Sequence, residues 1–489
     1  MSASTDTSFF GHPRGLQTLF FTEMWERFSY YGMRAILLLY MTAALAAGGM
    51  GLSAAEAAAI YGAYTAGVYM AAIPGGYIAD RLLGLRRSIF AGGVLIALGH
   101  FSMALGLRPL FFLGLILVVA GTGLLKPNIS AIVGSLYDAE DKRRDAGFSI
   151  FYMGINLGAF ISPLICGWLA QSETFKGVLG SMGLSPENSW HWGFGAAGVG
   201  MTLGLVQYVI GSRKLPETPV ANPAPNPAML WVQITAGCAL VAGLFYGLWD
   251  YRNWLFLVGT AAFFVWFVSQ TEPGVERKRS YAVLILFVFA ALFWAGFEQA
   301  GSSLNLFGDR FTRNEIFGMS FPSSFHQSTN SIFLILLAPA FAWLWLRLGR
   351  TGLEPSSGVK FALGLLFVGA GFAVVAVAAQ VSAANGDAAV GPQWLVMVYL
   401  LHTIGELCLS PVGLSTMTKL APARLAGSIM GVWFMATSIG NFIGGQVAGQ
   451  FETFPLPSLF GAVCLTSVAA GLVCLALAPT IKRLMGGVH

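Results

Sequence analysis

The sequence is short of charge, histidine and cysteine. Only 10% of its 489 residues are Lys, Arg, Asp or Glu, whereas 56% are hydrophobic. Soluble domains carry about a quarter charged residues, so this composition excludes an ordinary soluble protein and indicates an integral membrane protein. The mean hydropathy of +0.70 indicates the same. The net charge of +5 therefore does not indicate binding to nucleic acid.

Metal sites, disulfides and hydrolytic centres have no support in the sequence. The five cysteines lie in apolar segments without a CxxC motif or a histidine partner, so neither a disulfide framework nor a zinc site is expected. There is no HExxH motif and no Ser/His/Asp grouping, so we do not expect an enzyme. The first sixteen residues are polar and lack a small-residue cleavage pattern, so no removable signal peptide is expected.

Apolar runs, by contrast, are abundant, and a run of about twenty residues is long enough to span a bilayer. The 61 glycines suit helices that pack closely through small residues. There are fourteen such runs, an even number, so both termini are expected on the same side of the membrane. Fourteen spans are expected, near residues 17–46, 57–79, 88–106, 109–133, 147–170, 191–211, 228–248, 253–270, 282–306, 326–347, 359–382, 391–417, 425–450 and 457–480.

The distribution of basic residues indicates how these spans are oriented in the membrane, because cytoplasmic loops of membrane proteins are enriched in Lys and Arg. With the amino terminus placed in the cytoplasm, 19 of the 27 basic residues fall inside and three lie within spans. Only Arg108, Lys176, Arg252, Arg310 and Arg313 then fall outside. We therefore expect a multi-pass protein with both termini in the cytoplasm.

Proline divides the chain. Five prolines fall between residues 216 and 227, and proline at that density cannot continue a helix, so it indicates an extended linker. The simplest organisation is a six-helix bundle (residues 1–214), a linker with two inserted transmembrane helices (215–280) and a second six-helix bundle (281–489). The expected fold is an all-α integral membrane protein whose two bundles flank a central pathway. Such bundles can work by alternating access, with one half rocking against the other.

The first span holds two acids and two bases, Glu23, Glu26, Arg27 and Arg34. A charge near the bilayer centre costs from about 2.5 to above 10 kcal/mol. At about 100° per residue, three of these residues and Tyr30 fall nearly on one line. The alternative is an interfacial helix end at which Glu23 and Glu26 reach water, but apolar sequence continues for two turns beyond Arg34. We therefore expect an ionisable face that is turned inward.

Four acids and three bases are expected inside the membrane in total. Beyond the first span, Lys126 precedes Pro127, and Glu298 and Glu406 lie in spans of the second half. Unpaired buried ions are costly, so pairing is expected, and one acid is left over. That surplus acid favours coupling to protons, and no cofactor besides the coupling proton is expected. The alternative is a set of structural pairs with one acid solvated at a helix end.

The placement of these charges also predicts a ligand. Arg34 and Lys126 come from the first half, whereas Glu298 and Glu406 come from the second. A zwitterion would direct its carboxylate to the bases and its ammonium to the acids, so both halves would hold it. Aromatic and amide side chains suited to an adaptable pocket lie in the same spans, although each singly is also an ordinary packing residue. They are Tyr30, Tyr69, Tyr152, Asn156, Trp294, Asn330 and Trp433.

Several of these stretches resemble known transporters. Residues 75–87 resemble the loop signature of the major facilitator superfamily between its second and third helices. Residues 23–34 resemble the first-helix motif of the proton-coupled oligopeptide transporters, the POT or PTR family. Residues 148–158 resemble the fifth-helix signature of that family, and residues 293–305 and 405–410 also match it. The resemblance therefore covers nearly the whole chain.

The resemblance implies a symporter that imports di- and tripeptides with protons. It also implies roles for individual residues. The peptide carboxylate would meet Arg34 and Lys126, its amino terminus Glu406, and Asn156 and Asn330 would assist, with Tyr30, Tyr69, Trp294 and Trp433 lining the pocket. The proton would be handled by Glu23, Glu26, Arg27 and Glu298. The gates would be the salt bridges Arg34 with Glu298 outside and Lys126 with Glu406 inside.

The chain also departs from part of the family. Residues 57–79 contain no histidine, whereas animal members carry one in the second helix, so the proton role falls to carboxylates here. The loop near residues 383–392 is too short for the extracellular domain of animal members. The inserted helix pair is typical of bacterial members, so we expect the protein in a bacterial inner membrane. We also expect it to function as a monomer. Another small solute, such as nitrate or an amino acid, is the alternative cargo on the same fold.

Overall fold

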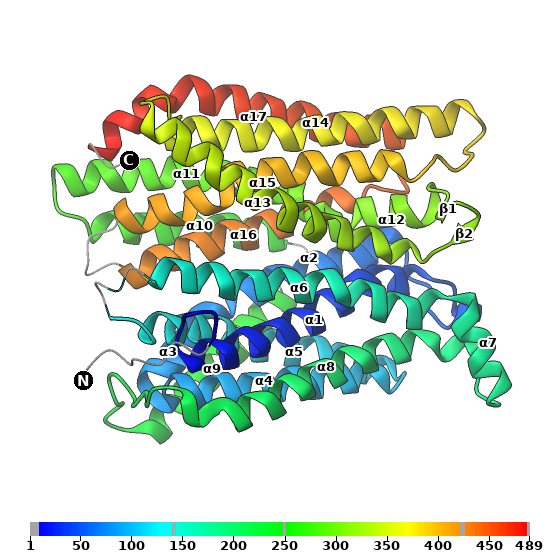
Figure 1. Cartoon of the computed structure of the whole chain (residues 1–489), viewed down its shortest axis with the longest axis horizontal. Coiled ribbons are helices and arrows are strands. Elements are labelled where there is room, and N and C mark those ends of the chain that lie inside the picture. Colours follow the sequence, from blue (N-terminus) through cyan, green and yellow to red (C-terminus); the bar gives the residue numbers. More distant parts are fainter. Residues whose placement is uncertain (1–8, 139–140, 142, 248–250, 421–425, 487–489) are drawn as a thin grey trace.

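The structure is a computed structural model that describes residues 9–138, 141, 143–247, 251–420 and 426–486. Its long helices run side by side along one direction (Figure 1). A short hairpin is added to them, in which β1 (Glu315–Ile316) pairs antiparallel with β2 (Met319–Ser320). Both chain ends lie at the same end of the molecule, here called the terminal end (Figure 1). The opposite end, with α7 and the hairpin, is called the distal end.

The first half of the chain forms six of the spans. A capping box starts the second one, because Ser53 Oγ accepts a hydrogen bond from Glu56 N (3.2 Å) and Glu56 Oε2 accepts one from Ser53 N (3.1 Å). The long helices are α1 (Arg14–Thr42), α2 (Ala54–Met70), α3 (Ala72–Ile78), α4 (Leu85–Ala104), α5 (Arg108–Ser135), α6 (Arg144–Gln171) and α8 (Ser189–Gly211). Shorter elements are η1 (Leu45–Ala47), the π-helix η2 (Ala79–Leu83), α7 (Glu173–Ser181), η3 (Pro186–Asn188) and η4 (Ser212–Lys214).

The second half forms another six spans. Its first span is broken, because the chain turns through a 3-10 segment between α11 and α12. The helices are α11 (Val275–Phe297), η6 (Glu298–Gly301), α12 (Ser303–Arg310), η7 (Ser323–His326), α13 (Gln327–Arg350), α14 (Ser357–Ala384), α15 (Gln393–Leu420), α16 (Ala426–Ala448) and α17 (Leu456–Met485).

The inserted pair consists of α9 (Pro227–Gly247) and α10 (Arg252–Ser269). Before it, residues 215–226 form no helix. The linker lies against η2, because Asn222 N donates to Asp80 O (2.9 Å) and Ala224 N donates to Arg81 O (3.1 Å). After it, α10 packs on α11. The insertion is therefore attached to both halves of the chain.

Helices occupy all fourteen predicted spans. By length and composition, nine helices of the described chain are suited to crossing a membrane, and two shorter apolar helices lie in α9 and α10. α1 is not among the nine, because its interior carries the charges predicted for it. Two spans are less regular than predicted: residues 57–79 are interrupted at Ala71, and residues 282–306 are interrupted at η6. Pro127 lies inside α5 without ending it.

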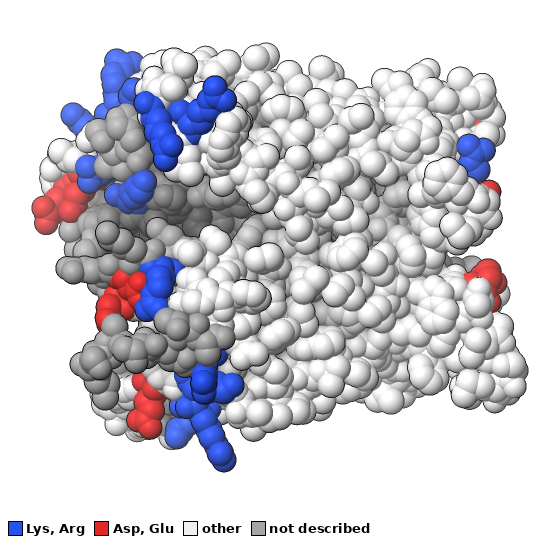
Figure 2. All heavy atoms as spheres, viewed as in Figure 1, with Lys and Arg blue, Asp and Glu red and all other residues white. Residues whose placement is uncertain are grey.

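Charge is distributed unevenly along the molecule. Figure 2 shows most visible Lys and Arg side chains at the terminal end, while the central band is almost free of charge. Two of the basic residues assigned to the cytoplasm, Lys142 and Arg424, lie outside the described residues. The distribution matches the basic bias from which the orientation was predicted.

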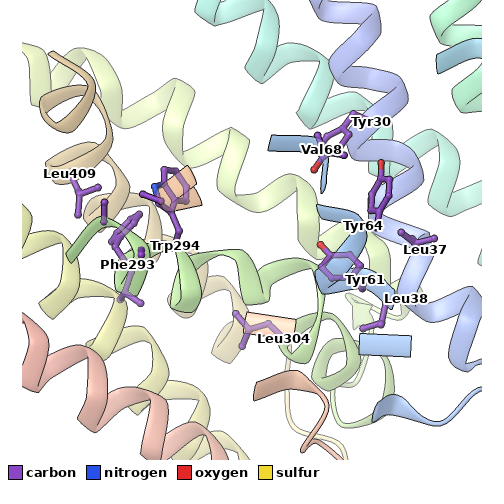
Figure 3. Packing of buried hydrophobic residues seen from close by; sticks show 14 of the residues in the cluster. Tyr30, Leu37, Leu38, Tyr61, Tyr64, Val68, Phe293, Trp294, Leu304 and Leu409 are labelled. Carbon is purple, nitrogen blue, oxygen red and sulfur yellow. The ribbon is translucent and has the colours of Figure 1, made fainter. Parts of the chain in front are cut away.

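The two halves meet along α2 with α16 and along α6 with α13. Small residues allow this approach: a methyl group on Gly445 would lie 2.8 Å from Gly62 Cα. Hydrogen bonds join the same helices, from Ser438 Oγ to Ala66 O (3.0 Å) and from Ser328 Oγ to Phe160 O (2.7 Å). One buried hydrophobic cluster contains side chains from both halves (Figure 3).

A polar contact closes the distal end. Glu452, in the loop between α16 and α17, pairs with Arg310 through Oε1 (2.6 Å to Nη1). Its other oxygen accepts a hydrogen bond from Ala54 N at 3.0 Å, at the start of α2. One carboxylate therefore bridges the two halves at this end.

Candidate functional site

Three charged side chains of α1 form a buried triad. Glu23 is 2% exposed, Glu26 0% and Arg27 3%. Arg27 Nε donates to Glu23 Oε1 at 2.8 Å and lies 2.9 Å from Glu26 Oε2. The second contact is an ion pair by distance only, because neither oxygen of Glu26 accepts a hydrogen bond from any described residue. One guanidinium thus serves two carboxylates, and a proton can neutralise Glu26 without breaking a hydrogen bond to the described residues.

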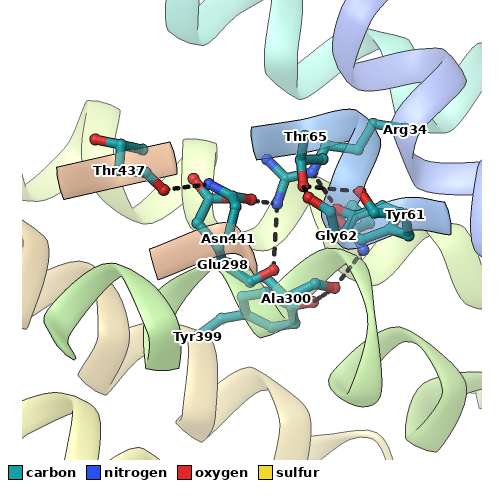
Figure 4. A network of polar contacts seen from close by, with 10 residues as sticks. Arg34, Tyr61, Gly62, Thr65, Glu298, Ala300, Tyr399, Thr437 and Asn441 are labelled. Carbon is teal, nitrogen blue, oxygen red and sulfur yellow. Dashed lines mark hydrogen bonds and ion pairs between the residues drawn. The ribbon is translucent and has the colours of Figure 1, made fainter. Parts of the chain in front are cut away.

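Arg34 connects α1 to the second half. Its Nη2 forms an ion pair with Oε2 of Glu298, the first residue of η6. Its Nε donates to the hydroxyl of Tyr61 at 2.6 Å. Figure 4 shows these side chains meeting beside the break between α11 and α12. Next to them, Asn305 Nδ2 donates to Ala35 O at 2.9 Å, which adds a second bond between the halves.

Lys126 of α5 is held by aromatic faces. Its Nζ lies 4.0 Å from the ring centroid of Tyr69 and 5.7 Å from that of Phe434. Such cation–π contacts stabilise a partly desolvated ammonium. No carboxylate in the described part of the chain lies within 4 Å of it, although the charges of Glu26 and Glu298 act on it at longer range. Lys126 is therefore a cation without a neutralising contact partner among the described residues.

Glu406 of α15 is the matching acid. Asn330 Nδ2, on α13, donates to Glu406 Oε2 at 3.1 Å and to Thr403 Oγ1 at 3.0 Å. The described residues contain no cation within 4 Å of this carboxylate. An amide fixes the carboxylate without neutralising it, so the charge is available for a positively charged ligand group.

The predicted aromatic and amide residues lie among these charges. Trp294 of α11 and Trp433 of α16 are buried and meet edge to face, with ring centroids 6.3 Å apart. Tyr30 is buried beneath Arg27, whose guanidinium lies 5.8 Å from the ring. On α6, buried Asn156 donates to Tyr152 O at 3.0 Å. The side chain of Tyr152 is 45% exposed.

Comparisons with known proteins show the family to which the chain belongs. The model of the family described as PTR2, POT family, matches residues 86–462. The chain is 41% identical to the peptide transporter YePEPT of Yersinia enterocolitica, over 99% of this chain and 98% of that one. It is 39% identical to a di-/tripeptide transporter of Lactococcus lactis, over 99% of both. The chain belongs to the POT family.

The structural comparison agrees with this membership. A crystal structure of a mutant peptide transporter POT in complex with alafosfalin superposes with a TM-score of 0.87 at 42% identity, over 98% of this chain and 97% of that one. This likeness confirms the predicted all-helical major facilitator fold. Membership in a transporter family also confirms that this multi-pass membrane protein is a transporter and not an enzyme.

In this POT-family chain the structure brings some of the predicted residues together. It joins Arg34 with Glu298, Arg27 with its two acids, Asn330 with Glu406 and Trp294 with Trp433. It does not join Lys126 with Glu406, which was the second expected salt bridge. This part of the predicted pairing is therefore not formed in the structure. The two residues remain as an unpaired base and an unpaired acid among the described residues.

Sequence reasoning missed the residues around the helix break. Tyr61 bonds Arg34, Gln327 Nε2 donates to Ala300 O at 2.5 Å, and Tyr399 Oη donates to the same carbonyl at 3.5 Å. Tyrosine and glutamine in apolar runs carry no distinctive spacing. The glycines and serines of residues 296–303 were the available signal for a break, because such residues favour irregular backbone.

Proposed function

We propose that the protein is a secondary active symporter that imports di- and tripeptides together with protons by alternating access. The observation that carries the proposal is the pair of opposite charges left without ionic contact partners, Lys126 on the first half and Glu406 on the second. A zwitterion of peptide size can bridge such a pair. The named functions of the POT-family relatives support the same cargo.

In this proposal the peptide lies across the two halves. Its carboxylate meets Lys126 and, once Glu298 leaves it, Arg34, while its ammonium meets Glu406. Asn330 holds the Glu406 carboxylate and is placed to contact the peptide backbone. Further contacts come from Asn156 and from the aromatic lining, which consists of Tyr30, Tyr69, Tyr152, Trp294 and Trp433.

The proton is carried by the buried carboxylates. Glu26 is the best placed of them, because its charge is balanced only through an arginine that it shares with Glu23. When either acid is protonated, Arg27 pairs with one carboxylate instead of sharing its charge between two. Protonation of Glu298 releases Arg34 and separates the halves at the distal end, which links proton binding to opening.

Two salt bridges serve as alternating gates. The Arg34–Glu298 contact is formed and Lys126 lies apart from Glu406, which supports a distal gate in its closed position. Formation of a Lys126–Glu406 bridge would close the terminal side after the distal side opens. Each gate joins the two halves, so only rocking of one half against the other exchanges them.

The proposed setting is a bacterial inner membrane. The basic terminal end faces the cytoplasm, so both termini are cytoplasmic and the distal end faces outward. We also propose that the monomer is the transporting unit, since both halves of the site come from one chain. The moving parts are residues 1–214 and 281–489, connected by the segment 215–280.

Uptake by the purified protein in proteoliposomes tests the function. A radiolabelled dialanine should accumulate when an inward proton gradient is imposed and only equilibrate without it. Excess unlabelled tripeptide should compete, whereas free amino acids and nitrate should not. Nitrate lacks the ammonium that Glu406 would bind. If nitrate or amino acids compete and peptides do not, the transported solute is nitrate or an amino acid and not a peptide.

A further inference from the structure

Tyr61 of α2 lies where the two halves meet, and none of the roles proposed above uses it. Its side chain is 2% exposed, and its hydroxyl accepts a hydrogen bond from Arg34 Nε at 2.6 Å. The Nη2 edge of the same guanidinium pairs with Glu298. Arg34 is therefore held on two sides, by a tyrosine of its own half and by a glutamate of the other half (Figure 4).

Gly301, the last residue of η6, makes room for this tyrosine. A Cβ atom at position 301 would overlap the Tyr61 hydroxyl and would lie 2.9 Å from Arg34 Nε. Gly301 is not among the residues with a positive φ, so space rather than backbone conformation is what requires glycine here. The hydroxyl of one half thus sits in a socket formed by the backbone of the other.

The socket is fixed to the second half. The break between α11 and α12 leaves the carbonyl of Ala300 outside a regular helix, and Gln327 of α13 donates to it at 2.5 Å. The hydroxyl of Tyr399, on α15, donates to it at 3.5 Å (Figure 4). Side-chain donors commonly satisfy the backbone groups freed by a break in a membrane helix. The turn with Glu298 and Gly301 is therefore anchored on two neighbouring helices.

We propose that Tyr61 is a positioning residue for the distal gate. It orients the Arg34 guanidinium toward Glu298 and inserts its hydroxyl beside Gly301. The Arg34–Glu298 ion pair and the contact with Gly301 therefore form at the same time when the gate closes. This inference rests on the alternating-access function proposed above. Arg34 and Tyr61 belong to the same half, so their hydrogen bond persists when the gate opens. The bond itself therefore does not favour either state, and Tyr61 acts through the orientation that it gives the guanidinium and through its fit beside Gly301.

The Tyr61→Phe variant tests the proposal, and Tyr64→Phe is its matched control. Tyr64 lies one turn further along α2 and is also buried, but its hydroxyl has no hydrogen-bond partner among the described residues. Spin labels at the exposed positions Ala46 and Ala384, with exposed Cys238 replaced by serine, report the distal distance between the halves in the full-length protein. Tyr61→Phe should raise the distal-open to distal-closed ratio about threefold, because the Arg34–Glu298 pair of the closed state loses the orientation that the hydroxyl gives it and the contact beside Gly301 is lost. Tyr64→Phe should leave the ratio unchanged.

Transport kinetics give a readout that a purely structural role would not move. A larger distal-open population should lower the KM for external peptide, because more molecules present the binding-competent state. Slower closure should at the same time lower the maximal rate. Gly301→Ala should raise the distal-open ratio in the same way, and its effect should shrink in a Tyr61→Phe background, where the overlapping hydroxyl is gone.

Wild-type distances and kinetics in Tyr61→Phe would overturn the inference, as would equal effects of Tyr61→Phe and Tyr64→Phe. Additive effects of Tyr61→Phe and Gly301→Ala would also overturn it, because the socket requires the two to interact. Failure of the proposed function has a different signature. In that case the wild-type protein itself does not accumulate dipeptide under a proton gradient.

Discussion

Replacing Glu26 by glutamine should separate peptide exchange from proton-driven accumulation. Glu26 is 0% exposed, and neither of its oxygens accepts a hydrogen bond from the described residues. Glutamine has the size of the protonated acid and removes the Glu26–Arg27 ion pair without breaking a hydrogen bond to the described residues. Arg27 keeps Glu23 as its partner, so we expect a change in the free energy of unfolding of only about 1 kcal/mol. Glutamine cannot release or bind the coupling proton. The variant should therefore bind and exchange peptide while failing to concentrate it.

The size of the expected loss follows from the driving force. One pH unit supplies about 1.4 kcal/mol for each proton, and a membrane potential of 100 mV supplies about 2.3 kcal/mol for each charge. Together they allow a limiting accumulation of about 500-fold for one proton per neutral peptide, since 1.4 kcal/mol is a factor of ten. The Glu26→Gln variant should remain near an accumulation ratio of one in the same proteoliposomes. Its counterflow rate, measured with peptide on both sides and no gradient, should stay within about threefold of wild type, a factor equivalent to less than 1 kcal/mol.

An exposed glutamate provides the control for this experiment. Glu272→Gln removes a carboxylate from the loop between α10 and α11, outside the interior, and should leave accumulation and counterflow unchanged. Accumulation by Glu26→Gln at the wild-type ratio would remove this residue from the coupling mechanism. Loss of counterflow together with accumulation would contradict the separation of binding from coupling on which the prediction depends.

Three further predictions concern the ends of the site. Lys126→Ala should weaken peptide binding by about 10- to 150-fold in calorimetry, because it removes one charge-assisted contact of about 1.5–3 kcal/mol; unchanged affinity would place the peptide carboxylate elsewhere. Arg34→Ala and Glu298→Ala should interact by about 1–3 kcal/mol in a double-mutant cycle on the distal-closed population, whereas additive effects would argue against a gate. Hydrogen bonding from Arg310 and from the Ala54 amide holds the pKa of Glu452 below its usual 4.5, despite the opposing effect of burial. The Glu452 bridge should therefore be fully present above pH 4.5 and be lost only as pH falls through the lowered pKa, so Glu452→Gln should increase distal opening about equally at pH 6 and pH 8 in spin-label measurements.

The sequence allowed most of the architecture to be predicted, because membrane spans depend on long apolar runs and the sequence has fourteen of them. The Arg34–Glu298 contact was also predicted, through the resemblance to the POT family, whereas the charge pattern alone did not separate it from the Lys126–Glu406 pair that the structure does not form. The interruption at η6 was not predicted. A helix break depends on whether neighbouring side chains such as Gln327 and Tyr399 can satisfy the freed backbone, and that becomes visible only when the helices are packed.

Long-range polar contacts were the other part that could not be predicted. Glu452 meets Arg310 and the start of α2 because three segments far apart in sequence converge at the distal end. Tyr61 was missed because a tyrosine in an apolar run looks the same whether it packs or hydrogen-bonds. The roles of the site residues in binding, coupling and gating remain predictions, and the structure contributes the contacts through which they can be tested.

The proline-rich linker has a mechanical consequence. Its backbone is bonded to the turn after α3 in the first half, while α10 at the other end of the insertion packs on α11 in the second half. In the proposed alternating-access cycle the two halves tilt against each other, and the inserted helices connect them. If the halves tilt as proposed, the inserted helices must bend or shift along one of these two attachments, and residues 215–226 are then the segment through which the motion of the halves is coupled.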